Sequence, residues 1–108
     1  MTVCCQVTTT LPDRLAADTL AARLVEERLA ACAQVVGPVA STYRWHDAIE
    51  HAEEWYCHLK TTVERFPALC QRIRELHTYQ VPEVIATPIT DGDPDYIRWI
   101  AEAVAPAS

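Results

Sequence analysis

The sequence predicts an α+β fold in which one small antiparallel sheet carries helices, with the order β-α-β-β-α-β and a C-terminal helix. Two observations carry this prediction. The hydrophobic period alternates between two and 3.6 residues along the chain, and residues 40–61, ASTYRWHDAIEHAEEWYCHLKT, have the pattern of one long β-hairpin. The 108 residues, half of them hydrophobic, suffice for one modest core, so we expect a single domain over residues 1–108.

The first strand is expected over residues 2–8, where Val3, Cys5 and Val7 alternate with their neighbours. A helix follows Pro12-Asp13 and should end near Arg28 or Leu29. Its apolar stripe consists of Ala17, Leu20, Ala21, Leu24 and Val25.

The central hairpin begins at Cys32, turns at residues 46–48 and returns to Lys60. Gly37-Pro38 interrupts its first strand, and proline cannot donate to a strand ladder, so we expect a bulge or bend on an edge strand. A two-stranded hairpin is marginal alone in water, and this one carries aromatic side chains toward its tip. We therefore expect another subunit to cover it.

Phe66, Leu69, Ile73 and Leu76 recur at helical spacing and predict a second helix. A connector over residues 79–82 then leads to a fourth strand over residues 83–89, and Asp93-Pro94 is a typical helix start. Together these elements make a ferredoxin-like sandwich with both main helices on one face of the sheet. The other face also carries apolar groups, and subunit association would cover it.

The charge and cysteine patterns narrow the function. The formal net charge is −6, with fifteen acidic and nine basic residues, and the absence of a basic patch argues against nucleic-acid binding. No apolar run is long enough to cross a membrane, and no signal-peptide pattern follows Met1. The five cysteines are an odd number without a C-x-x-C pair, which favours reduced thiols in a cytoplasmic protein.

Motifs for catalysis are missing from the sequence. It contains no G-x-S-x-G and no H-E-x-x-H, and its only glycines, Gly37 and Gly92, cannot form a phosphate-binding loop. No feature marks a cysteine or histidine as an activated nucleophile or base. We therefore expect a protein that is not an enzyme.

Several short strings, in order along nearly the whole chain, resemble the CutA divalent-cation-tolerance family. They are VEERLAAC at 25–32, STYRW at 41–45, IE at 49–50, KT at 60–61, H-x-Y-x-V-P-E at 77–83 and Y-x-x-W-I at 96–100. Each string is weak alone, but the set is specific.

The resemblance implies a cytoplasmic ferredoxin-like homotrimer with interlocked hairpins, associated with tolerance of copper and other divalent cations. It also implies similarity to the PII signalling proteins, which bind ligands in clefts between subunits. The implied copper ligands are Cys32 and His77, and the residues implied near inter-subunit clefts are Tyr43, Trp45, Lys60 and Glu83. Two positions depart from the family pattern. Asp47 replaces a turn glycine, which predicts a left-handed Asp47, and Thr78 replaces a proline beside His77.

Each implied role has a structural alternative. Cys32 also suits buried packing, and His77 also suits the end of a helix, where its ring can satisfy carbonyl groups. Lys60 and Glu83 could form a buried ion pair across neighbouring strands instead of binding a polar ligand in a cleft. The aromatic pair, Tyr43 and Trp45, is typical of interface packing.

Two functional hypotheses follow. The first is a trimer that binds copper or another divalent cation, although the isolated protein need hold none, and that acts in metal tolerance. The second is a PII-like regulatory trimer that binds a small organic ligand in clefts between its subunits. A stable trimer without any ligand is a third reading.

Overall fold

A computed structural model describes residues 3–106 of the chain. Its elements are β1 (Cys4–Leu11), α1 (Arg14–Glu26), β2 (Cys32–Trp45), β3 (Ala48–Thr62), α2 (Phe66–Leu76), β4 (Ile85–Ile89) and α3 (Pro94–Ala103). The strands form one antiparallel sheet in the order β2-β3-β1-β4. The predicted α+β order is therefore confirmed, while the start predicted for the first strand, at Thr2, lies outside the described residues.

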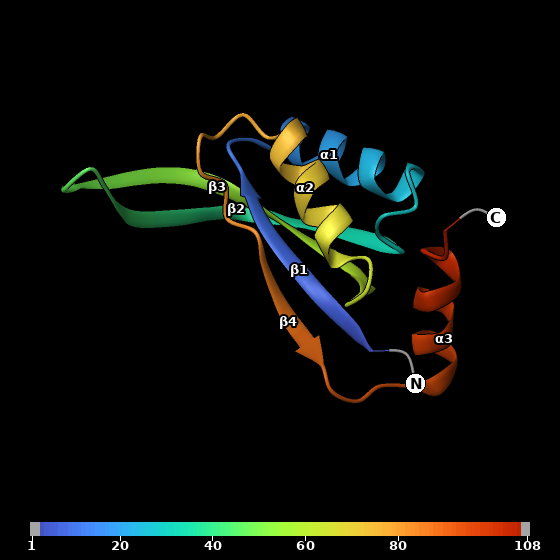
Figure 1. Ribbon diagram of the computed structural model, residues 1–108. Coiled ribbons are helices and arrows are strands. Elements are labelled where there is room, and N and C mark those ends of the chain that lie inside the picture. The colour runs from blue at the N-terminus through green and yellow to red at the C-terminus, as the bar shows by residue number, and fades with distance from the viewer. Residues whose placement is uncertain (1–2, 107–108) are drawn as a thin grey trace.

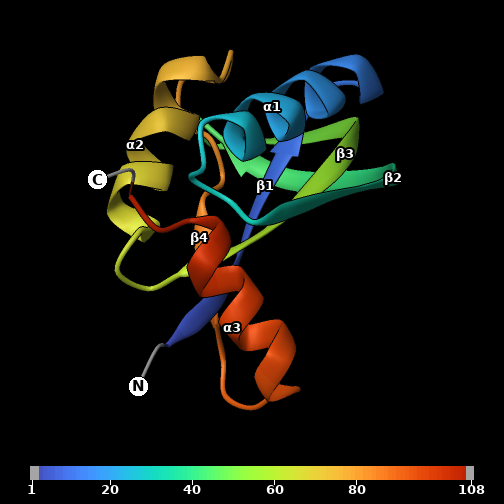
Figure 2. The same ribbon diagram turned by 90° about the vertical axis from the view of Figure 1, so that its right-hand side faces the viewer.

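Helices α1 and α2 lie side by side on one face of the sheet, and α3 lies apart from them at one end (Figures 1 and 2). The main core forms between these two helices and the sheet, around Val7, Leu24, Leu59, Leu69 and Ile73, all fully buried. A smaller cluster of Cys4, Ala31, Ile100 and Val104 holds α3 against the sheet.

The opposite face of the sheet carries mainly polar and aromatic side chains, because successive side chains of a strand point to opposite faces. It carries Thr8, Tyr56, His58 and Lys60, with Thr8 Oγ1 and His58 Nδ1 3.0 Å apart and the Tyr56 and His58 rings stacked at 5.3 Å. Neither α1 nor α2 covers this face. We call it the open face.

The hairpin formed by β2 and β3 extends well beyond the body of the molecule (Figure 1). β1 pairs with β3 only from Thr62 to Trp55, whereas β2 and β3 stay paired through residues 39–45 and 48–54. At about 3.3 Å per residue, this arm is roughly 23 Å long. It raises the radius of gyration to 14.5 Å, compared with about 13 Å for a compact domain of this length.

Two predicted irregularities of the hairpin are confirmed. The register shifts between Val36 and Val39, around Gly37-Pro38, and β2 is an edge strand. His46 and Asp47 have φ values of 48° and 67°, as a two-residue turn of type I′ requires. The left-handed conformation predicted for Asp47 is therefore present.

Helices α1 and α3 each begin directly after an aspartate that caps the N-terminus of the helix. Asp13 accepts a hydrogen bond from the Ala16 N–H at 2.8 Å, and Asp93 caps α3 with Pro94 at its first position. The prediction for the end of the first helix is wrong by about two residues, because α1 ends at Glu26 and Arg28 is left-handed with φ 63°. β4 likewise begins two residues after the predicted Glu83, at Ile85.

Candidate functional site: a groove at the base of the hairpin arm

A groove of about 690 Å³ lies where the connector between α2 and β4 crosses the base of the arm. Figure 1 shows this connector passing the hairpin before it enters β4. Three segments line the groove: the arm, the end of β1 and the connector. The lining residues are Thr10, Ala40, Ser41, Thr42, Tyr43, Trp45, Glu54, Tyr56, Tyr79, Gln80, Val81, Pro82 and Glu83.

A buried carboxylate joins the arm to the connector inside the groove. Glu54 in β3 is only 8% exposed, and its Oε2 accepts a hydrogen bond from the Tyr79 hydroxyl at 2.8 Å. Burial, and then the hydrogen bond to Glu54 and its negative charge, raise the pKa of the Tyr79 phenol. Tyr79 therefore stays protonated and acts as the donor of this pair.

Within one chain, the groove brings together three of the four residues that the family resemblance implies near clefts between subunits. Tyr43, Trp45 and Glu83 all line it. Lys60 does not: it lies on the open face, where its Nζ donates to Gln34 Oε1 at 2.9 Å. The expected Lys60–Glu83 ion pair is wrong for a single chain. Because β1 lies between β3 and β4, these residues are not on neighbouring strands, and no such pair occurs within residues 3–106.

His77 directly follows α2 and connects the start of the connector to β1 through hydrogen bonds. Its Nε2 donates to the Thr10 carbonyl oxygen at 2.7 Å, and its Nδ1 accepts from the Tyr79 N–H at 3.0 Å. Both ring nitrogens are therefore engaged within the chain, and this pattern requires the tautomer with the proton on Nε2. This arrangement fits a structural histidine better than a metal ligand, because neither ring nitrogen is free to bind a metal ion.

Cys32 lies at the start of β2, half-buried on the open face. Its Sγ is 3.5 Å from the Tyr96 hydroxyl of α3 and 3.9 Å from Gln34 Nε2. The hydrogen bond with Cys32 is the main cause that raises the pKa of Tyr96, with burial second. The thiol therefore has weak hydrogen-bond partners and retains access from the open face.

The two copper ligands implied by the resemblance are not brought together within one chain. Cys32 is opposite Lys60 in the sheet, while Thr10, which His77 contacts, is opposite Tyr56. These positions are four residues apart along β3, which corresponds to about 13 Å. Among residues 3–106 there is no group of three or more histidine, cysteine, aspartate or glutamate side chains arranged to hold a metal ion. A copper site at either residue would need donors from another subunit.

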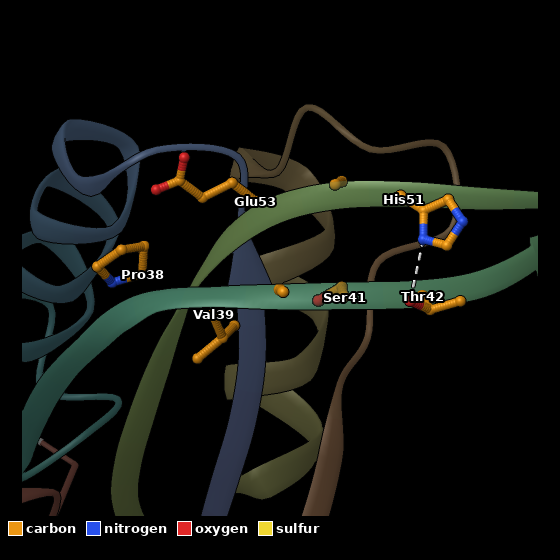
Figure 3. A pocket seen from close by; sticks show the side chains of 8 residues that line it. Pro38, Val39, Ser41, Thr42, His51 and Glu53 are labelled. Atoms are coloured by element: carbon orange, nitrogen blue, oxygen red, sulfur yellow. Dashed lines mark hydrogen bonds between the residues drawn. The ribbon is translucent and has the colours of Figure 1, made fainter.

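A second hollow, of about 530 Å³, lies along the arm around Pro38, Thr42 and His51. Figure 3 shows the His51 ring next to Thr42, whose Oγ1 is 3.1 Å from His51 Nδ1, and the Glu53 carboxylate directed away from that ring. No charged or metal-binding groups converge here, so this hollow is a weaker candidate than the groove.

Glu54 and Tyr79 are the site residues that the sequence did not identify. Strand alternation places Glu54 on the same face as Tyr56 and opposite to Glu53, and that signal was available in the pattern. The burial of Glu54 could not be seen in this pattern, because it depends on the connector, which comes from a distant part of the chain.

The described part of the chain includes no helix long and apolar enough to cross a membrane. All five cysteines are free thiols, of which Cys4, Cys5 and Cys57 are buried.

Comparison with known proteins assigns the family. Residues 5–103 match the model of the CutA1 divalent ion tolerance protein family. The divalent-cation tolerance protein CutA of Thermus thermophilus is 43% identical over 93 residues, covering 86% of this chain and 90% of that protein. The corresponding protein of Escherichia coli K12 is 41% identical over 91 residues, covering 84% of this chain and 81% of that protein.

Solved structures show the same likeness. The structure of CutA1 from Thermus thermophilus has a TM-score of 0.92 at 40% identity, covering 94% of this chain and 99% of that chain. CutA1 from Oryza sativa has a TM-score of 0.93 at 31% identity, with 97% and 96% covered. By sequence and fold, the chain belongs to the CutA1 divalent ion tolerance family.

Proposed function

We propose that this protein is a cytoplasmic homotrimer that binds divalent cations, copper foremost, and thereby contributes to metal tolerance, without catalytic activity. Membership of the divalent ion tolerance family carries the tolerance role. The free thiols support a reducing compartment such as the cytoplasm, although the relative from Archaeoglobus fulgidus is described as periplasmic.

The arm supports assembly into a trimer. Tyr43, Trp45 and Ile49 on the arm are 44%, 37% and 53% exposed in the single chain. Aromatic side chains of this kind are enriched in interfaces, and an arm of two strands gains stability when a partner covers it. Interlocking of hairpins from three subunits would cover both the arm and part of the open face.

Of the two copper ligands we propose, Cys32 fits the chemistry better. Its half-buried thiol lies on the open face, and thiolates are suitable donors for copper. One thiol is not a site, so neighbouring subunits would have to supply further donors. Copper at His77 would have to displace a hydrogen bond, either the Tyr79 N–H from Nδ1 or the Thr10 carbonyl from Nε2.

Native mass spectrometry with and without added Cu²⁺ tests this proposal on the wild type, Cys32→Ser and His77→Ala. We expect a trimer whose stoichiometric copper uptake is lost in Cys32→Ser. A monomer in the metal-free sample would contradict the trimer. Scattered uptake that neither substitution changes would contradict a defined copper site.

A second candidate function is a PII-like regulatory trimer that binds a small organic ligand in clefts between subunits. The groove favours this candidate, since Tyr43, Trp45 and Glu83 surround a volume of about 690 Å³, within the usual range for small-molecule sites of roughly 300–1,000 Å³. After incubation with a metabolite mixture, a retained organic mass would support it, and a bare or metal-only trimer would contradict it.

A further inference from the structure

We infer that the groove binds a small organic cation, an ammonium or guanidinium group on a short aliphatic stem, with Glu54 as its anchor. This inference deepens the second candidate function and does not depend on copper at Cys32.

The charge of the groove is the first argument. Within residues 3–106, the side chains that line it include two carboxylates, Glu54 and Glu83, and no lysine, arginine or histidine. An anion such as a phosphate ester would face like charges without a counter-charge. A cation would instead find opposite charges on both the arm and the connector.

The burial and hydrogen bonding of Glu54 also favour a cation. The residue is 8% exposed, and Tyr79 hydrogen-bonds only its Oε2. Its Oε1 takes part in no hydrogen bond within the described residues, and it is not one of the fully buried atoms that lack a partner, so it is open to the groove. A buried carboxylate without a compensating charge is unfavourable. An N–H of a bound cation would supply both the missing hydrogen bond and the missing charge.

The aromatic walls are the third argument. Tyr43, Trp45 and Tyr56 line the same groove, and the faces of such rings attract organic cations. Tyr79 remains a phenol and keeps its proton for Glu54, so it adds no negative charge. The combination of aromatic rings and a carboxylate discriminates an organic cation from a neutral molecule of the same shape.

Isothermal titration calorimetry on the native assembly tests the inference with two matched probes. Butylguanidinium carries the charge, and butylurea has nearly the same shape without it. We expect saturable binding of butylguanidinium and binding of butylurea at least tenfold weaker. This ratio corresponds to about one charge-assisted hydrogen bond.

The chain offers a matched pair of variants on adjacent residues of β3. Glu54→Gln removes the buried charge but keeps an acceptor for Tyr79, and we expect its butylguanidinium affinity to fall roughly 10- to 100-fold. Glu53→Gln removes an exposed charge outside the groove, and we expect a change of less than about twofold. Should Glu54→Gln fail to fold, Glu83→Gln, at an exposed position, replaces it with an expected loss of about threefold to tenfold.

Three results would overturn the inference: equal binding of the two probes, equal losses in Glu53→Gln and Glu54→Gln, or no binding by the wild-type assembly. Copper uptake measured on Glu54→Gln separates this inference from the metal proposal, because we expect it to equal that of the wild type.

Discussion

Replacement of His77 by alanine distinguishes a structural histidine from a metal ligand. The substitution removes the hydrogen bond to Thr10 at 2.7 Å and the one from Tyr79 at 3.0 Å. At about 1 kcal/mol for each bond, we expect the free energy of unfolding to fall by about 2 kcal/mol. The control is Gln71→Ala on the exposed side of α2, away from the arm, which loses one hydrogen bond with Glu75 and should cost less than about 0.5 kcal/mol.

Urea unfolding at one fixed protomer concentration measures this difference, because the stability of an oligomer depends on concentration. A loss of about 2 kcal/mol corresponds to a fall in melting temperature on the order of 10 °C for a domain of this size. Copper uptake on the same samples completes the test. A cost of less than about 0.5 kcal/mol together with complete loss of copper would refute the structural assignment and make His77 a ligand.

Two further predictions concern packing and thiol chemistry. A Cβ on Gly37 would lie 2.6 Å from Trp55 Cδ2, so Gly37→Ala should cost about 1–3 kcal/mol in urea unfolding. Gly92→Ala, where the nearest atom is the flexible Ile97 Cδ1 at 3.1 Å, should cost less, and equal costs would contradict this reasoning. Burial raises the pKa of Cys57 to about 12, so only about one molecule in ten thousand carries the reactive thiolate at pH 8. Alkylation followed by mass spectrometry should leave Cys57 unmodified until urea is added, and rapid labelling of the native protein would contradict its burial. The stability that depends on this protonated thiol is complete below about pH 9, the ordinary pKa, and is lost as the pH rises toward 12.

The fold was predictable because its determinants are local. The alternation around Val7 and the helical spacing of Leu69 and Ile73 indicate strand and helix before any tertiary contact is known. Gly37-Pro38 and Asp47 likewise marked the bulge and the turn, which depend on the backbone preferences of single residues. Element ends were less accurate, since they depend on caps and on residues such as Arg28 that adopt φ 63°.

The site was only partly predictable because it depends on contacts between distant segments. Family resemblance implied that Tyr43, Trp45, Lys60 and Glu83 lie near clefts between subunits, and within one chain three of them, all but Lys60, line the groove. Strand order separates Lys60 from Glu83 by inserting β1 between their segments, an order that the predicted ferredoxin-like arrangement already implies. No local pattern singled out Glu54, because its burial depends on the connector, whose Tyr79 donates a hydrogen bond to it.

The position of the groove links ligand binding to assembly. Tyr43 and Trp45 line the groove and are also exposed aromatic residues of the arm, so a subunit that covers the arm changes the walls of the groove. A ligand held between the arm and the connector fixes the arm relative to the body, in the position that a neighbouring subunit would contact. By thermodynamic linkage, a ligand that binds the assembled form more tightly also stabilises that assembly by the same free energy. For the proposed trimer, the dissociation constant should therefore fall in butylguanidinium and change much less in butylurea if the groove and the interface share these two side chains.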